Sequence, residues 1–211
     1  MLLPVGGLLS SCASQPAGSQ TSATSSASSA ASSSSAASSS SSASASSAQA
    51  QPGKALVAYY SAQGHTKAVA EKIAAELGAD TFAIEPVQPY SDSDLGYNSE
   101  DSRTSKERND PNRHVELKQV TPADFDSYDT MFVGYPIWWG GASWVVDDFV
   151  KGNDFTGKTV VPFCTSGSSP IGSSGTALAS MADSGNWLEG KRFDSGASAS
   201  EIQSWLSSLG L

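Results

Sequence analysis

The fold of this chain is decided by the stretch Ala55-Leu-Val-Ala-Tyr-Tyr-Ser-Ala-Gln-Gly-His-Thr-Lys67. Residues Ala55–Tyr60 have the length and the β-branched and aromatic content of a buried strand. After the loop Ser61–Thr66, apolar residues recur at helical spacing, at Val69, Ile73 and Leu77. The stretch therefore predicts a strand, a turn and a helix in direct succession.

The loop Ser61–Thr66 is predicted to bind an anion. Its backbone N–H groups and the helix dipole favour a phosphate, because the loop precedes a helix. Ser61 and Thr66 add hydroxyl donors, and Gly64 lets the backbone close around a ligand. The alternative is an ordinary capped turn that binds nothing. The patterns G-x-x-x-x-G-K-[ST] and G-x-G-x-x-G do not follow this strand, which argues against nucleotide hydrolysis and dinucleotide binding.

Composition divides the chain into an uncharged part and an acidic part. The sequence has 211 residues and a net charge of −9, and its first charged residue is Lys54. Residues 13–53 are nearly all Ser and Ala, with too little apolar surface to offset the entropy of ordering, so we expect a disordered tether. Residues 54–211 form the expected folded domain. No cluster of Lys and Arg occurs there, which argues against nucleic acid as a partner.

The beginning of the chain resembles a bacterial lipoprotein signal. A short apolar run ends in Leu9-Ser-Ser-Cys12, which is similar to a lipobox. The resemblance implies a signal peptide over residues 1–12, lipidation of Cys12, and an extracytoplasmic protein anchored to the cell membrane. The alternative is a cytoplasmic protein with an unusual amino-terminal segment. Cys164, the other cysteine, is expected to be a small buried residue without a disulfide partner.

Further strands and helices alternate along the rest of the chain. Strands are predicted at Thr81–Glu85, Met131–Gly134 and Thr159–Cys164 and within Trp187–Phe193, and helices follow Trp144, end near Ala182 and span Ser200–Leu209. The alternation predicts an α/β domain with a mostly parallel sheet and helices on both faces. The polar segment between Pro86 and Pro122 lacks periodicity and is expected to be a lid or a wall over a site.

Three loops follow predicted strands and meet at the carboxyl edge of such a sheet, where ligands bind. They are Ser61–Thr66, the aromatic Pro136–Gly141 and the small, donor-rich Thr165–Gly175. A planar aromatic ligand with a phosphate tail would use all three. The sequence predicts no metal site and no catalytic side chain.

These motifs resemble the flavodoxin family, and more closely its branch with a Trp-Trp loop. The match is carried by Ser-Ala-Gln-Gly-His-Thr66, Gly-Tyr-Pro-Ile-Trp-Trp-Gly140 and Pro-Phe-Cys-Thr-Ser-Gly-Ser-Ser169 in this order. The resemblance implies a doubly wound, five-stranded parallel sheet in the order 2-1-3-4-5. It also implies one FMN bound without a covalent link.

The resemblance assigns each binding residue to a part of FMN. The phosphate would be held by Ser61, Gln63, Gly64, His65 and Thr66. One side of the isoalloxazine would be flanked by Pro136, Ile137, Trp138, Trp139 and Gly140. Its pyrimidine edge would be approached by Thr165, Ser166, Gly167, Ser168 and Gly172. One of the two tryptophans could instead pack in the core.

Three functions stay open at the level of sequence. The first is a flavodoxin-like redox protein that transfers electrons outside the cytoplasmic membrane, to a partner protein or a small acceptor. The second is an FMN-dependent NAD(P)H reductase of quinones or similar acceptors. The third is a non-redox binding module for another phosphorylated ligand. A serine hydrolase is disfavoured because no G-x-S-x-G motif is present.

Overall fold

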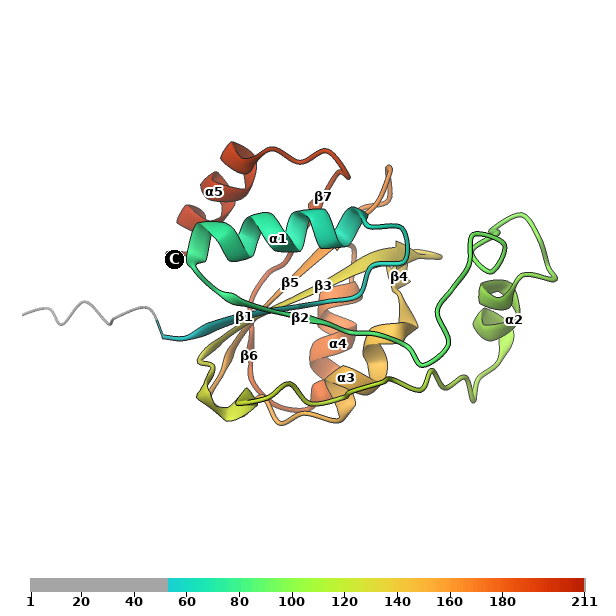
Figure 1. Cartoon of the computed structure of the whole chain (residues 1–211), viewed down its shortest axis with the longest axis horizontal. Helices are drawn as coiled ribbons and strands as arrows, with labels where there is room; N and C mark the ends of the chain where they lie inside the picture. The colour runs from blue at the N-terminus through green and yellow to red at the C-terminus, as the bar shows by residue number, and fades with distance from the viewer. Residues whose placement is uncertain (1–52, 211) are drawn as a thin grey trace, which may run out of the picture. The chain divides into compact units, whose positions relative to one another are not determined.

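The computed structural model describes residues 53–210, so the expected signal peptide, Cys12 and nearly all of the expected tether lie outside it. Its sheet has the order β2-β1-β3-β5-β6, with all of these pairs parallel (Figure 1). The strands of this path are β1 (Ala55–Tyr59), β2 (Asp80–Ala83), β3 (Thr130–Trp138), β5 (Thr159–Thr165) and β6 (Asn186–Trp187). Within this region, no helix has the length and apolar character needed to cross a bilayer.

The predicted strand order 2-1-3-4-5 is confirmed, with β5 as the fourth strand in the predicted count. The fifth strand is divided into β6 and β7 (Lys191–Phe193), which both pair with β5 in parallel. The break between them carries Gly190, where an added Cβ would lie 2.5 Å from the carbonyl oxygen of Pro162. A residue with a side chain at this position would collide with the backbone of β5.

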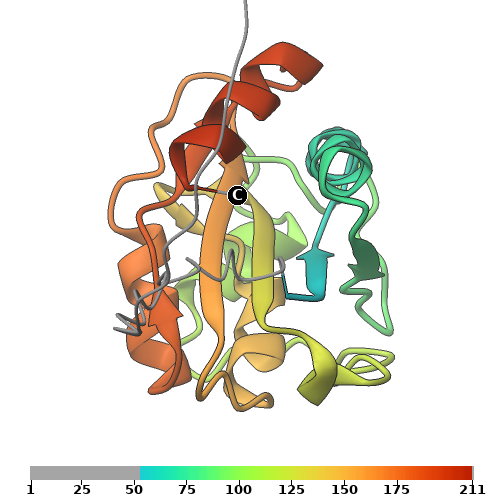
Figure 2. The same cartoon turned by 90° about the vertical axis from the view of Figure 1, so that its left-hand side faces the viewer.

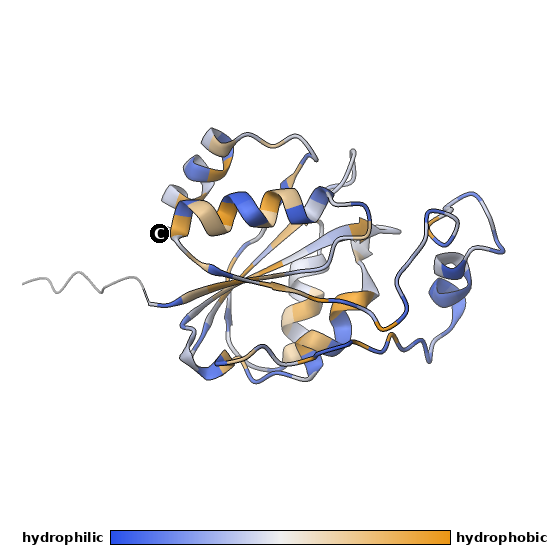
Figure 3. Cartoon of the chain, viewed as in Figure 1, coloured by the Kyte–Doolittle hydropathy of each residue, from blue (hydrophilic) through white to orange (hydrophobic). Residues whose placement is uncertain are grey.

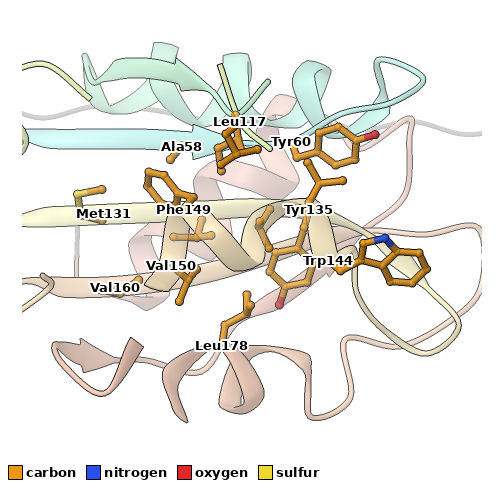
Figure 4. Close-up of a cluster of buried hydrophobic side chains, with 14 of the residues drawn as sticks. Ala58, Tyr60, Leu117, Met131, Tyr135, Trp144, Phe149, Val150, Val160 and Leu178 are labelled. Carbon is orange, nitrogen blue, oxygen red and sulfur yellow. The ribbon is translucent and has the colours of Figure 1, made fainter. Parts of the chain in front are cut away.

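Helices cover both faces of the sheet, as predicted. Helices α1 (His65–Leu77) and α5 (Ala199–Ser208) lie side by side on one face, and α3 (Asp147–Lys151) and α4 (Ser174–Ala182) lie on the other (Figures 1 and 2). Because side chains alternate along a strand, Val57 of β1 packs under α1 and α5, and Ala58 packs with the opposite core. Figure 4 shows part of that second core, where Phe149 of α3 and Leu178 of α4 meet the sheet.

The predicted start of the aromatic loop after β3 is wrong. The strand does not end at Gly134 but continues through Trp138, and then turns back into the antiparallel β4 (Gly141–Ala142). Trp139 and Gly140 form the turn with φ of 47° and 81°. Positive φ at both central residues is typical of the type I′ turn that suits a two-residue hairpin. The chain therefore uses this aromatic sequence as a hairpin.

The polar segment after β2 forms an excursion that is closed at its base. Pro86 bridges Leu117, and the N–H of Val87 donates to the carbonyl of Glu116 at 2.8 Å. The excursion contains a helix that the sequence analysis missed, α2 (Arg103–Asn109), which Figure 3 shows as almost entirely hydrophilic. A polar helix of this kind has no apolar periodicity to detect.

Two short 3₁₀ helices complete the described region. Phe125–Ser127 precedes β3, and Trp144–Val146 leads directly into α3. The helix predicted after Trp144 therefore exists, but its first turn is 3₁₀.

Candidate functional site

A cavity of about 300 Å³ opens at the carboxyl edge of the sheet, where the loops after β1 and β5 meet the end of β3. It brings together much of the predicted binding set. It is lined by Ser61, Ala62, Gln63, His65, Thr66, Tyr97, Pro136, Thr165, Ser166, Gly167 and Ser195.

The amino end of α1 forms one wall of this cavity and is built to receive an anion. Gly64 is its N-cap residue, with φ of 85°, and no side chain caps the helix. The first N–H groups of a helix have no acceptor within it, so these donors stay available. The hydroxyl oxygen of Ser61 is buried and has no hydrogen-bond partner. A buried hydroxyl without a partner is costly, and a ligand oxygen would satisfy it.

A hydrogen bond between two hydroxyls joins the first and third loops. Thr66 Oγ1 and Thr165 Oγ1 lie 2.8 Å apart in a buried position, and either can donate. One of the two hydroxyl protons makes this bond, which leaves the other for a ligand. Thr66 therefore both braces the cavity and keeps a capacity to bind.

Arg192 of β7 holds the third loop from behind. Its Nη2 donates to the carbonyl oxygens of Ser166 and Gly167 at 2.8 and 2.9 Å, and its Nε donates to Ser166 Oγ at 3.1 Å. Because C=O and N–H point in opposite directions in a trans peptide, the N–H groups of Gly167 and Ser168 are turned away from the guanidinium. Arg192 was not predictable from the sequence, because no motif places a β7 residue beneath this loop.

The two tryptophans of the hairpin have different surroundings. Trp138 is 4% exposed, and its ring centroid lies 5.7 Å from Tyr60, 5.2 Å from Tyr90 and 4.9 Å from Trp144. Trp139 is half-buried, at 5.7 Å from Trp144. Trp138 is thus a core residue, as one of the open alternatives had it.

Tyr97 supplies an aromatic wall that the sequence analysis did not identify. It belongs to the excursion, is 51% exposed, lines the cavity, and packs on Trp139 with the centroids 4.6 Å apart. The expectation that this segment forms a wall over a site agrees with that position. Nothing in the polar sequence around Tyr97 distinguishes it in advance.

Glu107 of α2 fastens the excursion to the rest of the domain. Its Oε2 accepts hydrogen bonds from Tyr90 Oη at 2.6 Å and from Trp144 Nε1 at 2.8 Å, and its Oε1 accepts from Arg103 Nε at 2.6 Å. The guanidinium of Arg103 also lies 3.8 Å from the centroid of the Tyr90 ring. One carboxylate thereby links α2, Tyr90 near the start of the excursion, and Trp144 at the start of the 3₁₀ helix that leads into α3.

Several predicted binding residues do not line the cavity. Gly172, with φ of 54°, lines a different hollow beside α4, and Gly64 takes part only as the N-cap of α1. The others are Ile137, Trp138, Trp139, Gly140 and Ser168. Apart from the buried Trp138, their assignments to the ligand stay predictions.

The cavity is lined mainly by hydroxyl-bearing and small residues, together with the side chains of Gln63 and His65. Among residues 53–210, no group of three or more His, Cys, Asp or Glu side chains could hold a metal ion. Cys164 is a free, buried thiol, as expected, and burial raises its pKa to about 12. A thiol with that pKa stays protonated at neutral pH.

Known proteins with a similar sequence and fold include flavoproteins. A family model described as Flavodoxin matches residues 54–209. The crystal structure of a protein from Bacteroides eggerthii, assigned as a flavoprotein, is 42% identical, with a TM-score of 0.70, and the match covers 75% of this chain and 99% of that chain. A second such protein, from Bacteroides uniformis, is 35% identical, with a TM-score of 0.69 and coverage of 74% and 99%.

A more distant structure has been solved with a ligand. It is a flavoprotein from Lactobacillus acidophilus in complex with FMN, which is 22% identical with a TM-score of 0.49, and the match covers 73% of this chain and 99% of that chain. No curated protein matches this chain.

Proposed function

The chain belongs to the flavodoxin family, and we propose that its cavity binds one FMN without a covalent bond. The observation that carries the proposal is the buried, unpartnered hydroxyl of Ser61 beside the uncapped amino end of α1. Together they form a donor site that lacks only an acceptor. Bound FMN supplies one-electron and two-electron redox chemistry, and the protein binds and orients it.

The phosphate of FMN is held by neutral donors. No Lys or Arg lines the cavity, so the backbone N–H groups of the Ser61–Thr66 loop carry the interaction. Hydroxyls of Ser61 and of the Thr66–Thr165 pair add charge-assisted hydrogen bonds. Pro136, Tyr97 and the loop that Arg192 braces would hold the ring system. Backbone N–H groups of that loop would donate hydrogen bonds to the polar edge of the ring.

Electron transfer outside the cytoplasmic membrane is the physiological role that we propose. The lipid on Cys12 anchors the protein, and the Ser/Ala-rich segment gives the flavin domain reach toward a donor and an acceptor. Its electrons go to a redox partner protein or to a small acceptor. This part of the proposal is supported by the lipobox-like sequence and by the composition of residues 13–53.

A second candidate function is an FMN-dependent NAD(P)H reductase of quinones or similar acceptors. It is favoured by a hollow of about 650 Å³ that shares Tyr97 with the proposed FMN cavity. A hollow in this position has room for a substrate next to the cofactor. Turnover of NAD(P)H with a quinone by the FMN-loaded protein separates this enzyme from an electron carrier.

Titration of the cofactor-free protein with FMN and with riboflavin tests the proposed binding mode. Riboflavin lacks the phosphate, so we expect it to bind at least about 100-fold more weakly than FMN. Ser61→Ala should weaken FMN binding about tenfold, and Ser173→Ala, at an exposed residue that does not line the cavity, is the matched control. Equal affinity for the two flavins would contradict a phosphate site in this loop. Failure to bind either flavin would favour the non-redox module.

A further inference from the structure

A second hollow lies on the outer side of the aromatic wall and is separate from the proposed FMN cavity. It measures about 650 Å³, and helix α2 and the segment before it form most of its lining, together with Trp139 of the β3–β4 hairpin. Tyr97 is the one residue that lines both hollows. A ligand in this space would therefore neighbour the cofactor without occupying its site.

An aromatic platform lines one side of this hollow. The rings of Tyr97 and Trp139 have centroids 4.6 Å apart, and Tyr97 is 51% exposed. Large apolar side chains are rarely this exposed in the described region, where the other example is Val87 at 50%. An exposed tyrosine face is a stacking surface for a planar ring.

A positively charged guanidinium lies over the same aromatic platform. The guanidinium of Arg108 lies 5.4 Å from the centroid of Trp139 and lines the hollow. Within residues 53–210, no carboxylate forms an ion pair with Arg108, although Arg103 of the same helix is paired with Glu107. Glu100, also in the lining, makes no ion pair there either. Arg108 thus keeps its five donors for a ligand.

Side chains that can donate and accept hydrogen bonds complete the lining. Asn98 and Asn109 present amides, and Ser105 presents a hydroxyl that already accepts a bond from Ser102 at 2.9 Å. The set combines a flat aromatic surface, the guanidinium of Arg108, the carboxylate of Glu100 and neutral polar groups. A negatively charged group on a stacked ring would pair with Arg108, and Glu100 would disfavour an anion placed beside it.

We propose that this hollow is a binding site for a planar aromatic compound with an anionic substituent, which stacks on Tyr97 and pairs with Arg108. Tyr97 lines both hollows, whereas Arg108 lines only this one, so Arg108 is the residue that distinguishes this site from the proposed FMN cavity. Its position beside Tyr97 makes such a compound a candidate substrate or effector of the flavin site.

Naphthalene-2-sulfonate and 2-naphthol test the proposal by calorimetric titration of the full-length protein, since they share a ring and differ in charge. We expect the sulfonate to bind at least about tenfold more tightly than the naphthol. Arg108→Gln should remove this difference. Tyr97→Ala should weaken both compounds about tenfold by removing the stacking surface.

Arg113→Gln is the matched control, because Arg113 also lies over a tryptophan, 5.0 Å from the centroid of Trp144, but does not line the hollow. It should leave the affinity for the sulfonate unchanged. An FMN titration of Arg108→Gln should match that of the unmodified protein. This result would distinguish a loss of sulfonate binding from a loss of FMN binding. Equal binding of the two compounds, unchanged binding by Arg108→Gln, or no binding at about 10 mM would each overturn the proposal.

Discussion

Thr66 shows how one side chain serves both the stability and the binding of this domain. Its hydroxyl is buried against that of Thr165, which ties the loop after β1 to the loop after β5. We predict that Thr66→Ala lowers the free energy of unfolding by about 1 kcal/mol and weakens FMN binding by about 1–2 kcal/mol. Thr66→Ser, which keeps the hydroxyl, should retain most of both. Urea unfolding and flavin fluorescence titration measure the two effects, and unchanged FMN affinity in Thr66→Ala would contradict the placement of the phosphate.

Asp147 makes stability depend on pH. Burial is the main cause that raises its pKa from 3.8 to about 6, and nearby Lys151 and Arg113 offset part of that effect. Because the folded protein binds this proton more tightly than the unfolded chain, the free energy of unfolding falls as pH rises from about 4 to 6, and the cost is complete above that range.

Asp147→Asn should therefore raise the free energy of unfolding at pH 7 by about 1–2 kcal/mol, after allowance for partial solvent screening. The gain should vanish below about pH 4. Asp154→Asn is the control and should lower the free energy of unfolding instead of raising it. Its carboxylate is stabilised in the folded protein, because it accepts a hydrogen bond from the N–H of Thr156 at 2.9 Å. Urea unfolding across this pH range measures the effect. A gain in stability of Asp147→Asn that persists at low pH would show that the pH dependence does not come from Asp147.

At the scale of elements, the β3–β4 hairpin places Trp138 in the core and Trp139 in the aromatic wall beside Tyr97. Trp138 contacts three aromatic rings in the core, whereas Trp139 sits in the turn with positive φ. We predict that Trp138→Ala lowers the free energy of unfolding by about 3–5 kcal/mol and that Trp139→Ala lowers it by less than about 2 kcal/mol. Trp138→Phe provides a milder variant if the alanine variant does not fold. Equal losses for the two alanine variants would contradict this division.

The carboxylate of Glu107 attaches helix α2 to Tyr90 and Trp144, beside the hydrogen bonds that Arg103 and Thr104 donate to the backbone carbonyls of Gln88 and Asp94. Glu107 accepts from Tyr90, Trp144 and Arg103, and glutamine would lose the charge and one acceptor. Glu107→Gln should therefore lower the free energy of unfolding by about 2–3 kcal/mol. Glu116→Gln, at an exposed residue of the same excursion, should have little effect in the same urea titration. Similar stability of both variants would show that the excursion is held by other contacts.

For the whole domain, the sheet could be predicted from the sequence more completely than the candidate site. The strands β1, β3 and β5 were predictable because they are buried on both faces and read as continuous apolar runs. The loop at Ser61–Thr66 was predictable because strand, glycine and helix are contiguous. Arg192 and Tyr97 were not, because each reaches the cavity through tertiary contacts from a segment without a motif.

The same limit explains the errors at element ends. The extension of β3 beyond Gly134 depends first on parallel pairing of Tyr135 and Pro136 with β5. It then depends on antiparallel pairing of Ile137 and Trp138 with β4, which is a property of the folded hairpin. Helix α2 has buried residues only at Thr104 and Ser105, so its sequence lacks the apolar stripe that reveals a helix. Local sequence patterns indicate which side chains are buried. The end of β3 and the polar helix α2 depend instead on pairing and contacts that form only in the folded domain.

The proposed lipid anchor belongs to the scale of the whole chain. We predict that the protein made in a bacterial host partitions with membranes and that Cys12→Ala releases it, because a diacylglycerol on Cys12 supplies two acyl chains. Intact mass of the membrane-bound form should show loss of the segment before Cys12 and addition of lipid. An unprocessed chain with an unmodified Cys12 would disprove the anchor while leaving the flavin domain unaffected.

The measurement that bears most directly on the central claim is the cofactor content of the purified full-length protein. Its visible spectrum should be that of a bound flavin, and acid should release one FMN for each chain, since the proposed site holds the flavin without a covalent link. Mass spectrometry of the released compound distinguishes FMN from riboflavin. A colourless protein that takes up no FMN when it is added would contradict the account.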